Sequence, residues 1–93
     1  MGKVKPFRRI CFICNRWESD YLQIEMHHIF EGRGRRQISD RYGLVVPLCS
    51  ECHDKVHRDA DLMQMLHEIG QEKAEANGMS RAEFIELFGR NYL

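Results

Sequence analysis

Two pairs of cysteines constrain the fold of this chain more than any other feature. Cys11 and Cys14 form one CxxC pair, Cys49 and Cys52 form a second, and 34 residues lie between the pairs. Two residues between thiolates let one turn present both sulfur atoms to a single ion, and two such turns complete a tetrahedron. Four thiolates leave no coordination position open, so the spacing predicts a structural Zn²⁺ site.

The length of the chain makes such a site important for stability. A chain of 93 residues forms one small domain that buries only about two-thirds of its unfolded surface, so its apolar core is marginal. Structural zinc contributes on the order of 10 kcal/mol or more, which is comparable to the whole stability of a small domain. The alternatives for these cysteines are two disulfides, or free thiols in the core.

The cellular compartment favours the metal over disulfides. The start of the chain, MGKVKPFRRI, is basic but has no apolar run behind it, and no stretch approaches the roughly 20 apolar residues of a membrane span. We therefore expect a cytoplasmic protein without a membrane partner, in which thiols stay reduced.

The charge of the chain is balanced overall but graded along it. Residues 1–36 carry eight Lys and Arg against four Asp and Glu, whereas residues 59–93 carry three against seven. A net charge of zero argues against binding nucleic acid by bulk charge alone. A net charge of zero is still compatible with local binding of a few phosphate groups.

The first half of the chain predicts two strands joined by a loop. Residues 21–27 alternate in character, which is typical of a half-buried strand, with Leu22, Ile24 and Met26 on one side. Residues 31–43 contain glycines and four arginines without apolar periodicity and predict a loop. Residues 44–48 are apolar and β-branched, so they predict a second strand, and their proline indicates an edge position or the strand's end.

The second half predicts helices. A short helix follows Ser50, which is expected as its N-cap, and a longer one covers residues 60–76. Ser80 begins a capping-box pattern that starts a last helix. That helix is expected to bury Phe84, Ile85 and Phe88.

Four of the five histidines lie in two tight clusters. His27 and His28 are adjacent at the end of the first predicted strand, where neighbouring side chains point to opposite sides. His53 and His57 are separated by four positions, so they share one face of the short helix and can chelate a single ion. The alternative is that these histidines merely occupy amphipathic surfaces, which is our interpretation of His67 in the long helix.

The residues around these histidines and cysteines resemble a known family. The segments Glu25-Met26-His27-His28-Ile29 and Val46-Pro47-Leu48-Cys49-x-x-Cys52-His53-x-x-x-His57 are similar to the HNH endonucleases, and above all to the subset in which CxxC pairs flank the ββα-metal unit. The resemblance covers roughly residues 11–58. It implies an α+β fold: a single nuclease domain over residues 1–93, with a zinc-stapled ββα core at 11–58 and additional helices at 59–93.

The resemblance also implies roles for the histidines. His27 would bind a catalytic metal and His28 would be the general base. His53 would complete the metal site, His57 could ligate as well, and Glu25 would have an auxiliary role. One feature departs from the family, because no asparagine precedes the second strand. Either backbone groups or a neighbour such as Asp40 brace the loop instead, or the base is less well oriented than in the family.

The implied activity is metal-dependent hydrolysis of DNA phosphodiester bonds, giving 5′-phosphate and 3′-hydroxyl ends. An imidazole takes the proton of the attacking water, and a divalent metal neutralises the charge that develops on the phosphate. Imidazole ligands suit the later transition metals, so we expect Mn²⁺, Ni²⁺ or Co²⁺ to support activity better than Mg²⁺. One site per chain nicks one strand, and a double-strand break needs two chains. The sequence leaves monomer and homodimer open.

Four arginines crowd the segment that follows the predicted base. We expect them to contact the phosphate backbone of DNA around the cleavage point, the alternative being a solvated polar loop. They are Arg33, Arg35, Arg36 and Arg41. Nothing resembles a recognition helix, so little sequence preference is expected. Small free-standing HNH proteins are often encoded by phages, which is an expectation from the family alone.

Two other classes of protein share part of this pattern. A non-catalytic zinc module that binds nucleic acid explains the cysteines and arginines, but it leaves the four clustered histidines without a role. A zinc-held protein-interaction domain would use the acidic C-terminal helices as its contact face. Cleavage of plasmid DNA distinguishes the enzyme from both.

Overall fold

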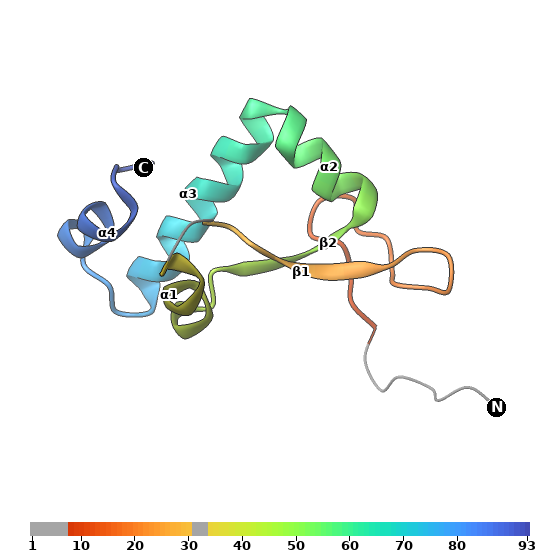
Figure 1. Cartoon of the computed structure of the whole chain (residues 1–93), viewed down its shortest axis with the longest axis horizontal. Coiled ribbons are helices and arrows are strands. Elements are labelled where there is room, and N and C mark those ends of the chain that lie inside the picture. The colour runs from red at the N-terminus through yellow and green to blue at the C-terminus, as the bar shows by residue number, and fades with distance from the viewer. Residues whose placement is uncertain (1–7, 31–33) are drawn as a thin grey trace.

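The computed structural model describes residues 8–30 and 34–93. These residues form two strands and four helices in this order (Figure 1): β1 (Ile24–His28), α1 (Arg35–Tyr42), β2 (Val45–Cys49), α2 (Ser50–Arg58), α3 (Ala60–Ala76) and α4 (Arg81–Phe88). The result is a small α+β fold, as the sequence predicts. None of the helices in the described part of the chain is long and apolar enough to cross a membrane.

The two strands form an antiparallel sheet that holds the rest of the chain in place. His27 of β1 is paired with Val46 of β2, and Ile24 at the other end is paired with Cys49. The sheet runs beneath the angle that α2 and α3 form with each other (Figure 1). Because β2 leads directly into α2, the chain folds back over one face of the sheet and buries Val46 and Leu48 there.

The predicted apolar side of β1 is buried only in part. Ile24 is 2% exposed, as predicted, but Met26 is 42% exposed, whereas its neighbour His27 is only 6% exposed. The reason is that α2 covers the face that carries His27. Alternation along a strand shows that two faces differ, but it does not show which of them a later helix will cover.

The segment predicted as a loop contains the helix α1. The prediction of a loop was wrong. The helix buries few apolar side chains, so its sequence shows too short an apolar pattern to indicate a helix. Its apolar contacts with the core come from Ile38 and Tyr42, four positions apart and both partly buried. The helix ends at Gly43, whose φ of 71° is the left-handed conformation that terminates helices, and its N–H donates to the carbonyl of Ser39.

The later helices begin close to their predicted starts. α2 starts one residue early, so that Cys49 rather than Ser50 is its N-cap. The carboxylate of Asp59 accepts hydrogen bonds from the first backbone amides of α3. Ser80 caps α4 as predicted, since its Oγ accepts a hydrogen bond of 3.1 Å from the N–H of Glu83.

The C-terminal helices pack on the sheet through an aromatic cluster. Phe30, just beyond β1, lies with its ring 4.4 Å from that of Phe88 and 5.4 Å from that of Phe84. Both α4 phenylalanines are buried as predicted, but Ile85 is 39% exposed and was predicted wrongly. Residues 59–93 therefore extend the same core rather than forming a separate unit.

Candidate functional site

The four cysteines gather at one end of the sheet. Their Sγ atoms all lie within 4.8 Å of one another, and three of the four residues are buried: Cys11, Cys49 and Cys52. All four are free thiols. This clustering indicates a structural metal site, as the CxxC spacing predicts, and the set of four sulfur donors fits zinc.

Backbone hydrogen bonds form the turn that carries the first cysteine pair. The N–H of Asn15 donates to the carbonyl of Cys11 over 2.9 Å, and Asn15 takes a positive φ of 62° that turns the chain. The N–H of Phe12 donates to the carbonyl of Pro47, which fixes this turn to β2. The second pair needs no separate turn, because Cys49 ends β2 and Cys52 lies in the first turn of α2.

Arg16 joins the two cysteine pairs from outside. Its guanidinium donates to Cys14 Sγ at 3.2 Å, to Cys49 Sγ at 3.5 Å and to Glu51 Oε2 at 2.7 Å. The hydrogen bond from Arg16 lowers the pKa of the Cys14 thiol to about 6, whereas burial raises the pKa of Cys52. Arg16 therefore favours the thiolate that binds metal. Sequence reasoning missed this residue, although a cation two positions after a CxxC pair is a usable signal.

A second cluster consists of three imidazoles. The ring nitrogens of His27, His53 and His57 lie within 4.8 Å of one another. Two come from one face of α2, with ring centroids 4.8 Å apart, and His27 faces them from β1 at 5.1 Å from His53. Three nitrogen donors suit a zinc-like or later transition metal and leave coordination positions for water or a substrate oxygen.

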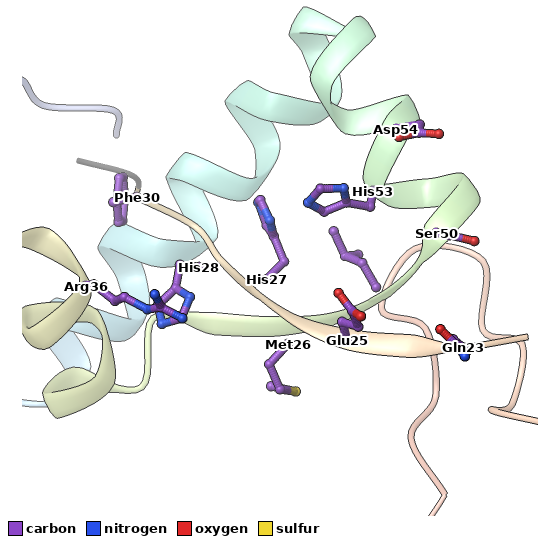
Figure 2. A pocket seen from close by; sticks show the side chains of 11 residues that line it. Gln23, Glu25, Met26, His27, His28, Phe30, Arg36, Ser50, His53 and Asp54 are labelled. Atoms are coloured by element: carbon purple, nitrogen blue, oxygen red, sulfur yellow. The ribbon is translucent and has the colours of Figure 1, made fainter. Parts of the chain in front are cut away.

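His28 lies beside this cluster but has a different partner. Its Nε2 is 2.9 Å from Oδ1 of Asp40 in α1. Figure 2 shows that His27 points toward His53 from β1. The two adjacent histidines are thus separated as the sequence predicts for neighbours at a strand end.

A cleft of about 440 Å³ connects these groups. Its wall includes His28 and Arg36 at one side, His27 and His53 of the imidazole cluster, and Glu25 (Figure 2). Sequence reasoning did not identify Gln23, Ser50 and Asp54, which also line the cleft.

The predicted arginines lie in different surroundings. Arg36 lines the cleft, whereas the guanidinium of Arg35 lies 5.8 Å from the ring of Phe88 and that of Arg41 lies 5.9 Å from the ring of Tyr42. Arg33 lies outside the described residues. The structure therefore brings one of the described arginines to the cleft, and contact with DNA stays a prediction for all of them.

Comparison with protein-family models, with curated proteins and with solved structures gives no match to this chain. The arrangement of its own residues is therefore the basis on which a function is assigned.

Proposed function

We propose that this chain is a metal-dependent endonuclease of the HNH type, which hydrolyses phosphodiester bonds in DNA with little sequence preference. The observation that carries the proposal is that His28 lines the same cleft as His27 and His53, two of the three residues of the imidazole cluster. The order of the elements also supports it. A paired strand ending in two histidines, a return strand and a helix with two more histidines follow one another as the HNH resemblance implies.

The cysteine cluster has a structural role in this proposal. Four thiolates around one Zn²⁺ leave no position for substrate, so this metal does not take part in the chemistry. It joins the N-terminal turn to α2, and Cys52 is the direct neighbour of His53. Zinc binding at the cysteines therefore fixes where the helix presents its histidines.

The imidazole cluster would hold the catalytic metal. His27 supplies one nitrogen from the sheet, and His53 and His57 supply two from α2. A divalent ion held there supplies positive charge that stabilises the transition state and the departing 3′ oxygen. Because all three donors are nitrogen, we expect Mn²⁺, Ni²⁺ or Co²⁺ to serve better than Mg²⁺.

The other residues of the cleft position and activate water. His28 accepts the proton of the water molecule whose oxygen attacks phosphorus, while the bond from phosphorus to the 3′ oxygen breaks and that oxygen takes a proton from solvent. Such general-base help is worth about 10²–10⁴-fold in rate. Arg36 faces the same cleft and offers a cation to the phosphate.

A plasmid-nicking assay tests this function. Purified protein is mixed with supercoiled plasmid and Mn²⁺, and His28→Ala is assayed beside it after both proteins show equal zinc content and equal melting temperature. We expect the wild-type chain to nick the plasmid and the variant to be slower by about 10²–10⁴-fold. DNA binding by both proteins without nicking would instead identify a non-catalytic zinc module.

A further inference from the structure

The contact between His28 and Asp40 carries an inference about how this histidine is held. We infer that Asp40 is a positioning residue, which keeps His28 as the tautomer with hydrogen on Nε2 and leaves Nδ1 as the nitrogen that accepts a proton. The catalytic importance of this positioning rests on the proposed nuclease function, but the tautomer of His28 can be measured without any enzymatic activity.

The geometry supports a direct hydrogen bond. His28 Nε2 lies 2.9 Å from Asp40 Oδ1, and the side chain of His28 is mostly buried, with 22% of it exposed. An ionised carboxylate can only accept hydrogen bonds, so the ring nitrogen that faces it must carry the hydrogen. A neutral imidazole has one N–H and one lone pair, and the lone pair is then on Nδ1.

Short backbone contacts hold Asp40 at this distance. Its neighbour Ser39 is fully buried, and the carbonyl of Ser39 accepts a hydrogen bond of 2.7 Å from the N–H of Leu44. The carbonyl of Leu44 in turn accepts from the N–H of Ile29, which directly follows His28. Two hydrogen bonds therefore join the turn of α1 that carries Asp40 to the end of β1 that carries His28.

The face of α1 that carries Asp40 also carries Arg36, which lines the cleft. Arg36 and Asp40 are four positions apart and thus lie on one side of the helix. The helix that replaces the expected loop presents a cation to the substrate and an acceptor to His28. Asp40 contacts the histidine itself, which differs from the loop-bracing role of the asparagine that this chain lacks.

Substitution by asparagine gives the sharpest test. An amide can donate to Nε2 as well as accept from it, so Asp40→Asn no longer fixes the tautomer, and Asp40→Ala removes the partner altogether. Asp54→Asn is the matched control, because Asp54 lines the cleft and has no contact with the ring of His28 in the described structure. Asp40 and Asp54 are both exposed, so all three variants are expected to fold.

The readout is long-range ¹H–¹⁵N correlation spectra of the zinc-loaded protein, in which the two nitrogen shifts of His28 report its tautomer. The wild type and Asp54→Asn should show the Nε2–H form alone, and both Asp40 variants should show a mixture of the two tautomers. In the nicking assay the Asp40 variants should lower kcat by up to about 10²-fold with KM unchanged. An Nδ1–H tautomer in the wild type, or spectra that do not change on either Asp40 substitution, would overturn the inference.

The nuclease proposal and the role of Asp40 can be refuted separately. If the wild type does not nick DNA, the nuclease proposal is wrong, while the spectra still decide whether Asp40 fixes the ring. If the wild type nicks and the Asp40 variants keep both full kcat and the wild-type tautomer, the nuclease proposal stands and the role of Asp40 is refuted.

Discussion

The Sγ atoms of Cys14 and Cys49 lie 3.8 Å apart, although 35 positions separate the two residues in the chain. This contact joins the N-terminal turn to the start of α2, at the end of the sheet opposite the aromatic cluster of Phe30. The fold is thus held at both ends by different means: sulfur ligands at one and packed rings at the other.

Replacing one cysteine tests whether the cysteine cluster binds a structural zinc ion. Cys49→Ser removes one ligand from the four, and since structural zinc contributes on the order of 10 kcal/mol, the variant should lose both its zinc and its cooperative thermal transition. Elemental analysis and a thermal melt measure these. Ser50→Ala, at the exposed neighbouring position, should keep one zinc per chain. Normal melting of a zinc-free Cys49→Ser protein would contradict a structural role for the metal.

Arg16 should slow the loss of that metal. Its guanidinium contacts a sulfur atom from each pair, which shields the thiolates and offsets their charge. In Arg16→Ala we expect a chelator to remove zinc about tenfold faster or more. Arg58→Ala serves as the control, because Arg58 lies on the same helix as Cys52 but, among the described residues, donates its hydrogen bond to the backbone carbonyl of Asp54 and not to a cysteine. Equal rates of zinc release in the two variants would show that Arg16 does not slow the loss of the metal.

The aromatic end is tested by the smallest substitution available. A Cβ atom on Gly70 would lie 2.6 Å from Cε2 of Phe30 and 3.0 Å from Cγ2 of Ile29. Phe30 cannot retreat, because the rings of Phe84 and Phe88 pack against it. Gly70→Ala should therefore lower the free energy of unfolding by about 1–3 kcal/mol, although alanine favours helices. Urea denaturation measures this, and stabilisation would mean that α3 does not pack as described.

His67 should make the fold sensitive to acid. Burial, with a smaller contribution from the charge of Arg90, lowers the pKa of His67 below its ordinary value of 6.5. The unfolded chain therefore binds a proton before the folded chain does, so this contribution to stability is fully present above pH 6.5 and is lost as the pH falls through the folded pKa. His67→Phe keeps a ring stacked on Phe30 and cannot titrate. Denaturation midpoints from pH 7.5 to pH 5.5 should fall more for the wild type than for this variant.

Arg36 should be the arginine of α1 that matters most for DNA binding. It lines the cleft, whereas Arg41 on the same helix lies over the ring of Tyr42. Arg36→Ala should weaken binding to a duplex and reduce the slope of log K against log salt concentration by about 1, and Arg41→Ala should change it less. Fluorescence anisotropy across a salt series gives both slopes, and identical slopes would place the phosphate contact elsewhere.

The sequence predicted those parts of the molecule that depend on local spacing. Each CxxC pair needs only a short local segment to present its sulfur atoms, a turn for the first pair and the start of α2 for the second, and His53 and His57 share a helix face by periodicity alone. The start of α4 followed from Ser80 and Glu83, whose capping contacts are local as well. These features require no knowledge of how distant segments pack.

The parts that sequence reasoning missed depend on packing between segments. The burial of His27 in place of Met26 follows from the face that α2 covers, which lies more than twenty positions later in the chain. The contact of Asp40 with His28 requires α1, a helix whose apolar pattern is only two residues long. Arg16 acts on Cys49 across the fold, so neither spacing nor periodicity could reveal that hydrogen bond.

Anomalous diffraction from crystals of the zinc-loaded protein soaked in Mn²⁺ would test the proposed catalytic metal site most directly. We expect one manganese peak among the imidazole nitrogens of His27, His53 and His57, with coordination positions open toward the cleft that His28 lines. A peak at another site, or none among the three rings at a concentration that supports nicking, would contradict the proposed catalytic centre.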